Sequence, residues 1–198
     1  MARTIAKDHD EKRGLIRKAA AKVFAEQGFD RASMSLLARE AGISKANIYH
    51  YYSGKDALLF DLLDTKLSSL LERIASVDVG GLSSEEALRE TVTEILLAYQ
   101  GEDYVHQIQG TMLGVLPEDQ QRILKGYQIE MVRRLSELVQ ATSSDVFEGD
   151  KPKLHATTMS IFGMLNWFYM WAGDKGEADR RAYASLVTDL VLNGVKGL

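Results

Sequence analysis

The chain has 198 residues, of which 45% are hydrophobic and 26% are charged, and its formal net charge is −4. These proportions are typical of a globular protein and exclude a disordered or fibrous chain. The lack of cysteine excludes disulfides, thiolate metal sites and a cysteine nucleophile. No segment approaches the roughly 18 consecutive apolar residues of a membrane span, and the first residues lack the apolar core of a signal peptide, so we expect a cytoplasmic protein.

Charge is distributed unevenly along the chain. Residues 1–60 contain 11 Lys and Arg against 7 Asp and Glu, whereas the remainder contains 13 against 21. A basic first part on an acidic remainder is expected when only the first part meets nucleic-acid phosphates. Ordinary variation in surface charge is the alternative explanation.

Apolar residues recur with helical spacing in almost every segment, and no convincing alternating strand pattern is present. The two prolines, Pro117 and Pro152, stand where a helix can begin with proline in its first turn. We therefore predict an all-α fold of about nine helices.

The first two predicted helices lie close to the N-terminus. An apolar stripe predicts a helix over 10–27, which Gly28 ends in a left-handed conformation. Ser33 is the expected cap of a short second helix, which closes at Gly42.

A third short helix follows directly. Ser44 is its expected cap, and it spans 45–51. Ser53 and Asp56 form a capping-box pattern that opens a long fourth helix. Two caps nine residues apart leave room for only two helical turns between them.

The remaining segments also read as helices. The fourth helix ends at about residue 76, and 77–83 is the expected joint. Ser83 with Glu86 repeats the capping box and opens a helix reaching about residue 101. The last predicted helices span approximately 103–114, 117–143, 152–172 and 177–196.

Two short helices joined by a tight glycine turn form a helix-turn-helix, whose second helix enters the DNA major groove while the first supports it. Ile48 and Tyr52 fall on the core face of the third helix. The exposed face carries Lys45, Ala46, Asn47, Tyr49, His50 and Tyr51. Donors, acceptors and aromatic surface in this mixture suit a DNA groove better than a hydrophobic interior.

Residues 38–59, AREAGISKANIYHYYSGKDALL, strongly resemble the signature of the TetR family. Its members combine A-x-x-A-G-[VI]-S with Y-x-[YH]-[FY]-x-x-K-x-x-L at this spacing. The resemblance implies a homodimeric repressor that binds a palindromic operator and is released by a small-molecule effector. It also implies a helix-turn-helix domain over 1–54 and a ligand-binding and dimerisation domain over 55–198.

The resemblance further implies roles for individual side chains. Base-approaching positions are matched by Lys45, Ala46, Asn47 and His50. Phosphate-gripping positions are matched by Ser33, Tyr49, Tyr51 and Lys55, and Ser35 matches a position that sometimes reaches a base. Asn47 is suited to adenine and Lys45 to guanine.

The last two predicted helices indicate an assembly. Residues 159–171 are apolar over an unusually wide arc, and the 177–196 segment carries a regular apolar stripe. In the TetR family these helices pair with their symmetry mates in a four-helix bundle, which implies a homodimer. Burial within one subunit is the alternative.

Residues 162–167 with Trp171 resemble family members that sense fatty or aromatic acyl-CoA thioesters. Met170 and Ala172 depart from that pattern, because a basic residue and an aromatic are frequent there. We expect a pocket among the middle helices, with candidates Tyr99, Tyr104, His106, Met112, Met159, Phe162, Asn166 and Trp167. Core packing explains each single residue equally well.

Other functions find less support. The chain has no G-x-S-x-G, no glycine-rich phosphate loop and no H-E-x-x-H, so we expect neither an enzyme nor a cofactor. The four histidines lie far apart in the sequence, and we expect no metal site. The principal alternative is a helical protein-interaction adaptor without DNA binding. Among regulators, an activator and a sensor of drugs or other apolar compounds remain open.

Overall fold

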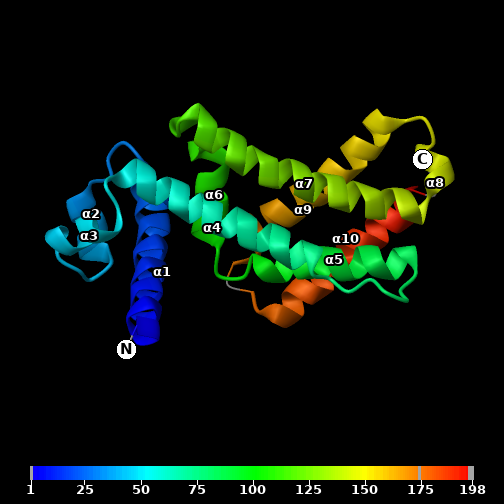
Figure 1. Ribbon diagram of the computed structural model, residues 1–198. Coiled ribbons are helices and arrows are strands. Elements are labelled where there is room, and N and C mark those ends of the chain that lie inside the picture. The colour runs from blue at the N-terminus through cyan, green and yellow to red at the C-terminus, as the bar shows by residue number, and fades with distance from the viewer. Residues whose placement is uncertain (1, 174, 196–198) are drawn as a thin grey trace. The chain divides into compact units, whose positions relative to one another are not determined.

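The computed structural model describes residues 2–173 and 175–195, and all regular elements within these ranges are helical (Figure 1). The helices are α1 (Ala2–Gln27), α2 (Met34–Glu40), α3 (Lys45–Tyr51), α4 (Lys55–Ala75), α5 (Ser84–Ala98), α6 (Asp103–Met112), α7 (Glu118–Thr142), α8 (Ser144–Phe147), α9 (Lys151–Ala172) and α10 (Glu177–Val195), with a 3-10 turn at Leu113–Val115. The prediction of an all-α fold is confirmed. None of the described helices combines the length and apolarity needed to cross a membrane.

Besides the end of α5 at Ala98 rather than about residue 101, the structure differs from the predicted helices at three places. Helix α1 begins at residue 2 instead of 10, since residues 2–9 include neither glycine nor proline to interrupt it. Helix α8 is a single turn within a predicted connection, anchored by the buried Phe147. With α8 included, the described part of the chain has ten α-helices, whereas about nine were predicted.

The third difference is the start of α4. The helix begins at Lys55, one residue later than a cap at Ser53 requires, and the carbonyl of Gly54 accepts the amide of Leu58. Glycine is tolerated at the position before a helix, so the predicted Ser53 box is not needed. At the other end of the chain, the predicted boundary at residue 196 lies outside the described residues.

One compact unit contains the chain up to residue 67 together with 104–124. In it α1 packs against α2, and α2 packs against α3. Phe24, Leu37 and Ile48 are fully buried and come from α1, α2 and α3 respectively. Apolar burial of this kind is what holds two seven-residue helices, which are too short to be stable alone.

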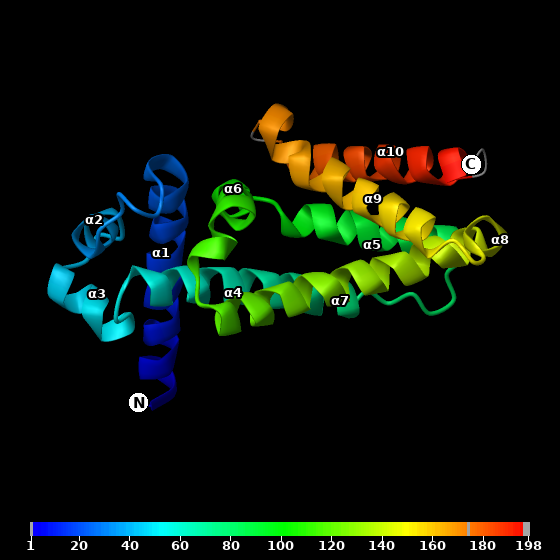
Figure 2. The same ribbon diagram turned by 90° about the horizontal axis from the view of Figure 1, so that it is seen from above.

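The other compact unit contains 68–103 and 125–198. Helix α10 packs against both α5 and α9, as can be followed in Figure 2. The capping box predicted for α5 is confirmed: the Ser83 hydroxyl accepts the Glu86 amide at 3.3 Å, and the Glu86 carboxylate accepts the Ser83 amide at 2.8 Å.

Helices α4 and α7 each contribute residues to both units. The first part of α7, 118–124, belongs to the unit with the helix-turn-helix, and its remainder belongs to the other. These packing units do not follow the proposed domain boundary after residue 54, which stays a prediction about function.

Candidate nucleic-acid interface and effector site

The helix-turn-helix is fixed by two serine caps and one glycine. The Ser33 hydroxyl accepts the Leu36 amide at 3.2 Å, and the Ser44 hydroxyl accepts the Asn47 amide at 3.1 Å. Gly42 has a φ of 68°, in the left-handed region that the tight turn requires. Both predicted caps are confirmed, and they set where α2 and α3 begin.

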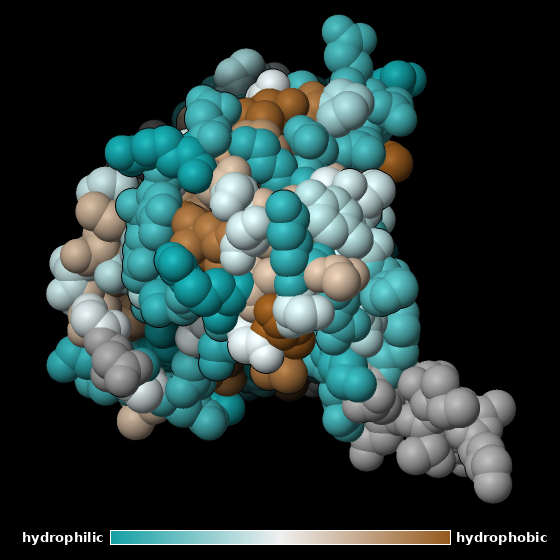
Figure 3. Space-filling model, turned by 90° about the vertical axis from the view of Figure 1, so that its left-hand side faces the viewer, coloured by the Kyte–Doolittle hydropathy of each residue, from teal (hydrophilic) through white to brown (hydrophobic). Residues whose placement is uncertain are grey.

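Helix α3 has a buried side and an exposed side. Ile48 and Tyr52 are buried, as predicted. The other side is accessible: Lys45, Ala46, Tyr49 and His50 are exposed, and Asn47 and Tyr51 are half-buried. Figure 3 faces the α2 and α3 side of the molecule, where hydrophilic residues predominate.

The remaining predicted DNA contacts lie around this face. Ser33 and Ser35 are exposed at the start of α2. The Tyr51 ring lies 5.0 Å from the imidazole of His9, measured between ring centroids. This contact restrains the Tyr51 ring against α1.

Lys55 has a role within the protein. Its ammonium donates to the carbonyls of Phe29 at 2.8 Å, Asp30 at 3.3 Å and Ala32 at 3.4 Å, and it lies 4.4 Å from the Phe29 ring centroid. These bonds fix the turn between α1 and α2. A phosphate contact by Lys55 stays a prediction, and any such contact would share the ammonium with these carbonyls.

A polar cluster that is centred on Asp61 was not predicted from the sequence. Asp61 on α4 accepts the Tyr52 hydroxyl at 2.6 Å and the Arg17 guanidinium at 3.0 Å, and it pairs with Arg13. Burial raises the pKa of the Tyr52 phenol, which therefore stays a neutral donor. The cluster joins α1 and α4 to the residue that ends α3. The spacing of the two arginines, four apart on one predicted helix, was the available signal.

The predicted effector residues fall into two groups. Tyr104, His106 and Met112 lie on α6, in the same compact unit as the helix-turn-helix. Tyr104 is exposed, and its hydroxyl donates to Glu26 on α1 at 3.0 Å. This contact occupies the polar end of Tyr104 with a neighbouring helix.

Of the other five candidates, four lie on α9, and Tyr99 directly follows α5. The buried Tyr99 donates its hydroxyl to the amide oxygen of Asn166 at 2.9 Å, and burial raises the pKa of that phenol. Phe162 is buried, whereas Met159 and Trp167 are 44% and 59% exposed. The structure thus brings Tyr99 and Asn166 together and directs Met159 and Trp167 outward.

Exposed apolar side chains are concentrated on α9 and α10. The large ones are Met159, Trp167, Met170 and Trp171 on α9, with Leu186 and Leu190 on α10. Large apolar surface of this kind marks an interaction site in soluble proteins.

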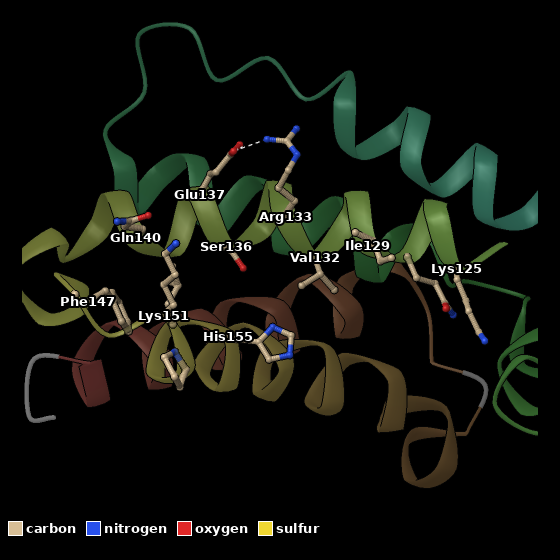
Figure 4. A pocket seen from close by; sticks show the side chains of 14 residues that line it. Lys125, Ile129, Val132, Arg133, Ser136, Glu137, Gln140, Phe147, Lys151 and His155 are labelled. Atoms are coloured by element: carbon tan, nitrogen blue, oxygen red, sulfur yellow. Dashed lines mark hydrogen bonds and ion pairs between the residues drawn. The ribbon is translucent and has the colours of Figure 1, made fainter. Parts of the chain in front are cut away.

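A groove of about 1010 Å³ separates α7 from the start of α9 (Figure 4). None of the eight predicted effector residues lines it. Its walls include Ile129, Val132 and Ser136 from α7, with Lys151 and His155 from α9. Sequence reasoning missed it because Ile129 and Val132 read as part of an ordinary amphipathic stripe. No group of three or more metal-binding side chains occurs in the described ranges.

Comparison with known proteins covers most of the chain. The family model described as "Bacterial regulatory proteins, tetR family" matches residues 16–62, and "Tetracyclin repressor-like, C-terminal domain" matches 81–195. A TetR-family regulator from Bordetella parapertussis superposes with a TM-score of 0.84 at 33% identity, covering 94% of this chain and 96% of that one.

Individual relatives differ in coverage. The fatty acid metabolism regulator protein of Bacillus subtilis is 25% identical over 89% of this chain and 92% of its own length. The regulator YuxN of the same organism is 35% identical, but only 28% of its length is matched, by 42% of this chain.

A solved structure of AibR with isovaleryl coenzyme A and operator DNA has a TM-score of 0.72 at 20% identity, covering 91% of this chain and 98% of that one. At that identity the likeness concerns the fold. The C-terminal model alone spans more than half of the chain, and the protein belongs to the TetR family of transcriptional regulators.

Proposed function

We propose that the protein is a transcriptional repressor that binds a palindromic operator as a homodimer and is released by a small apolar or acyl-CoA-like effector. The observation that carries the DNA-binding part is the division of α3 into a buried side at Ile48 and an exposed polar side. A short helix held in this way presents one face to the major groove. Because a repressor must meet the chromosome, the proposal places the protein in the cytoplasm.

The proposed contacts follow from the position of each side chain. Lys45, Ala46, Asn47 and His50, and in some sites Ser35, approach base edges. Ser33, Tyr49, Tyr51 and Lys55 contact phosphates, and in this way set the register of α3 in the groove.

Dimerisation through α9 and α10 allows the protein to bind a palindromic DNA site. The exposed apolar side chains on these helices need a protein partner to remove them from water. A second copy of the same face satisfies this by two-fold symmetry. Two recognition helices about 34 to 36 Å apart then read half-sites one DNA turn apart.

The effector part is supported by relatives. The Bacillus subtilis relative is named for fatty acid metabolism, and AibR was solved with isovaleryl coenzyme A. Effector and operator affinities must be reciprocally coupled, so an acyl-CoA that releases the operator binds less tightly to the DNA complex by the same factor.

The test of DNA recognition is a selection of random duplexes on the purified protein at two salt concentrations. We expect a palindrome with half-sites about one turn apart. Salt-sensitive binding without an enriched sequence, or no binding, would favour the adaptor. Ala46→Glu, which places a carboxylate on the exposed face of α3, should abolish the enrichment, whereas Ala75→Glu at an exposed position of α4 should retain it.

A further inference from the structure

The groove between α7 and α9 has an apolar bed. Ile129 and Val132 lie on the side of α7 that borders it (Figure 4). Leu154 of α9 also lines the groove. Phe147, which is buried, lines the end where α8 leads into α9. Ile129 is 69% exposed, the largest exposed fraction among the large hydrophobic residues that the structure describes. An isoleucine so exposed beside a groove is expected to be covered by something apolar.

The charged side chains around this bed are mostly basic. Lys125, Arg133 and Lys151 line the groove, against the single carboxylate of Glu137. Arg133 pairs with both Glu137 and Glu130, so these charges are already compensated. The Lys151 side chain is exposed and has no hydrogen-bond or ion-pair partner among the described residues. An apolar bed with an uncompensated ammonium at its edge matches a molecule that carries an apolar chain and a negative head group.

We infer that this groove binds the effector, and that the effector is an amphipathic anion. Its acyl chain lies on Ile129, Val132 and Leu154, and its anionic head group pairs with Lys151. The inference rests on the proposed effector response. It places the effector-binding site in this groove and not around Tyr99 and Trp167. A volume of about 1010 Å³ is at the upper end of the range of about 300 to 1,000 Å³ for ligand pockets, enough for a long chain.

The residues that line this groove are distinct from the large exposed apolar residues proposed for dimerisation. Met159, Trp167 and Met170 lie further along α9, and none of them borders the groove. The helix that forms one wall, α7, contributes its first residues, 118–124, to the compact unit that holds the helix-turn-helix. A ligand that shifts or stiffens α7 therefore acts on an element shared by both units.

The experiment is isothermal titration of the full-length protein with dodecanoyl-CoA, dodecanoate, benzoyl-CoA and the neutral dodecanol. Ile129→Glu places a carboxylate on the apolar bed, and Ile123→Glu is the matched control, since Ile123 is 46% exposed on the same helix but outside the groove. Lys151→Glu reverses the proposed head-group contact, with the exposed Lys175→Glu as its control. Thermal melts and operator affinity without ligand verify that each variant is folded.

We expect Ile129→Glu to weaken binding of the tightest anionic probe at least tenfold and Lys151→Glu to weaken it three- to tenfold. The two controls should change it less than twofold, and dodecanol should bind at least tenfold less tightly than dodecanoate. If the wild type binds an acyl-CoA and Ile129→Glu binds it equally well, the groove is not the site, although the effector response stands. If the wild type binds no probe, both are overturned, while operator affinity still reports on DNA binding.

Discussion

Helix α3 and helix α9 both expose side chains, but with opposite chemistry. The exposed side of α3 carries Lys45, Tyr49 and His50, whose polar ends are well hydrated in water. The exposed side of α9 carries large apolar groups such as Trp167 and Met170, which are poorly hydrated. Exposure alone therefore says little about a partner. The chemistry that is exposed predicts a polar, charged partner for α3 and an apolar protein surface for α9.

Helices α3 and α9 also differ in the contacts that hold them in place. Helix α3 is only seven residues long and depends on its serine cap and on Tyr52, which the Asp61 cluster holds. Helix α9 has 22 residues and a buried side that runs from Thr158 to Ala172. Substitutions near α3 should therefore affect folding and recognition together, whereas substitutions of the large exposed apolar residues on α9 and α10 should leave the protomer folded and act through assembly.

The largest effect is expected from the apolar face. Leu186→Glu on α10 places a charge where the second subunit should pack, while the folded protomer tolerates it because Leu186 is 52% exposed. We expect a monomer in analytical ultracentrifugation and at least a hundredfold loss of operator affinity, because one recognition helix cannot bind a palindrome tightly. Val79→Glu, at another exposed apolar position, is the control. A dimeric Leu186→Glu protein would refute the proposed interface.

The Asp61 cluster should give the next largest effect. Asp61→Ala leaves Arg13, Arg17 and Tyr52 without their shared acceptor and should lower the free energy of unfolding by about 2 to 3 kcal/mol. Operator affinity should fall as well, because Tyr52 ends α3. Urea unfolding and fluorescence anisotropy measure the two effects. Glu72→Ala, at an exposed carboxylate of α4, should change neither, and an unchanged Asp61→Ala protein would show that the cluster does not hold α3.

Two variants separate base recognition from phosphate contact. Asn47→Ala should relax the preference at one base pair of each half-site, by about 1 to 3 kcal/mol. Lys55→Ala should weaken all sequences alike and flatten the salt dependence. It should also lower the free energy of unfolding, because three backbone carbonyls lose their donor. Binding titrations on single-substitution operators test this, and identical behaviour of the two variants would contradict the assignment.

Local signals explain how much the sequence could predict. The caps at Ser33, Ser44 and Ser83 involve groups within three residues of each other, and all three were predicted correctly. The Asp61 cluster joins residues 9 to 48 positions apart, and no local pattern specifies that distance. The α7 groove likewise depends on where α9 begins relative to α7. Contacts set by helix packing were therefore the ones missed.

Two serine caps, Ser44 and Ser83, lie in different compact units and should have smaller effects. Ser44→Ala and Ser83→Ala should each lower the free energy of unfolding by about 1 kcal/mol. Only Ser44→Ala should also lower operator affinity, since its cap fixes the first turn of α3. Chemical denaturation and anisotropy with the same preparations provide both readouts. Equal losses of operator affinity would show that recognition merely follows overall stability.

The smallest expected effect concerns the charge of Glu86. Hydrogen bonds from the hydroxyl and backbone amide of Ser83 lower the pKa of this carboxyl. A carboxyl whose pKa is lower in the folded state stabilises the fold above its unfolded pKa, and this contribution is lost as pH falls through the folded pKa. Glu86→Gln mimics the protonated form. Its melting temperature should therefore be slightly below that of the wild type at pH 7, and the difference should disappear only as pH falls below the ordinary pKa of a glutamate side chain. A difference independent of pH would mean that shape, and not charge, accounts for the cap.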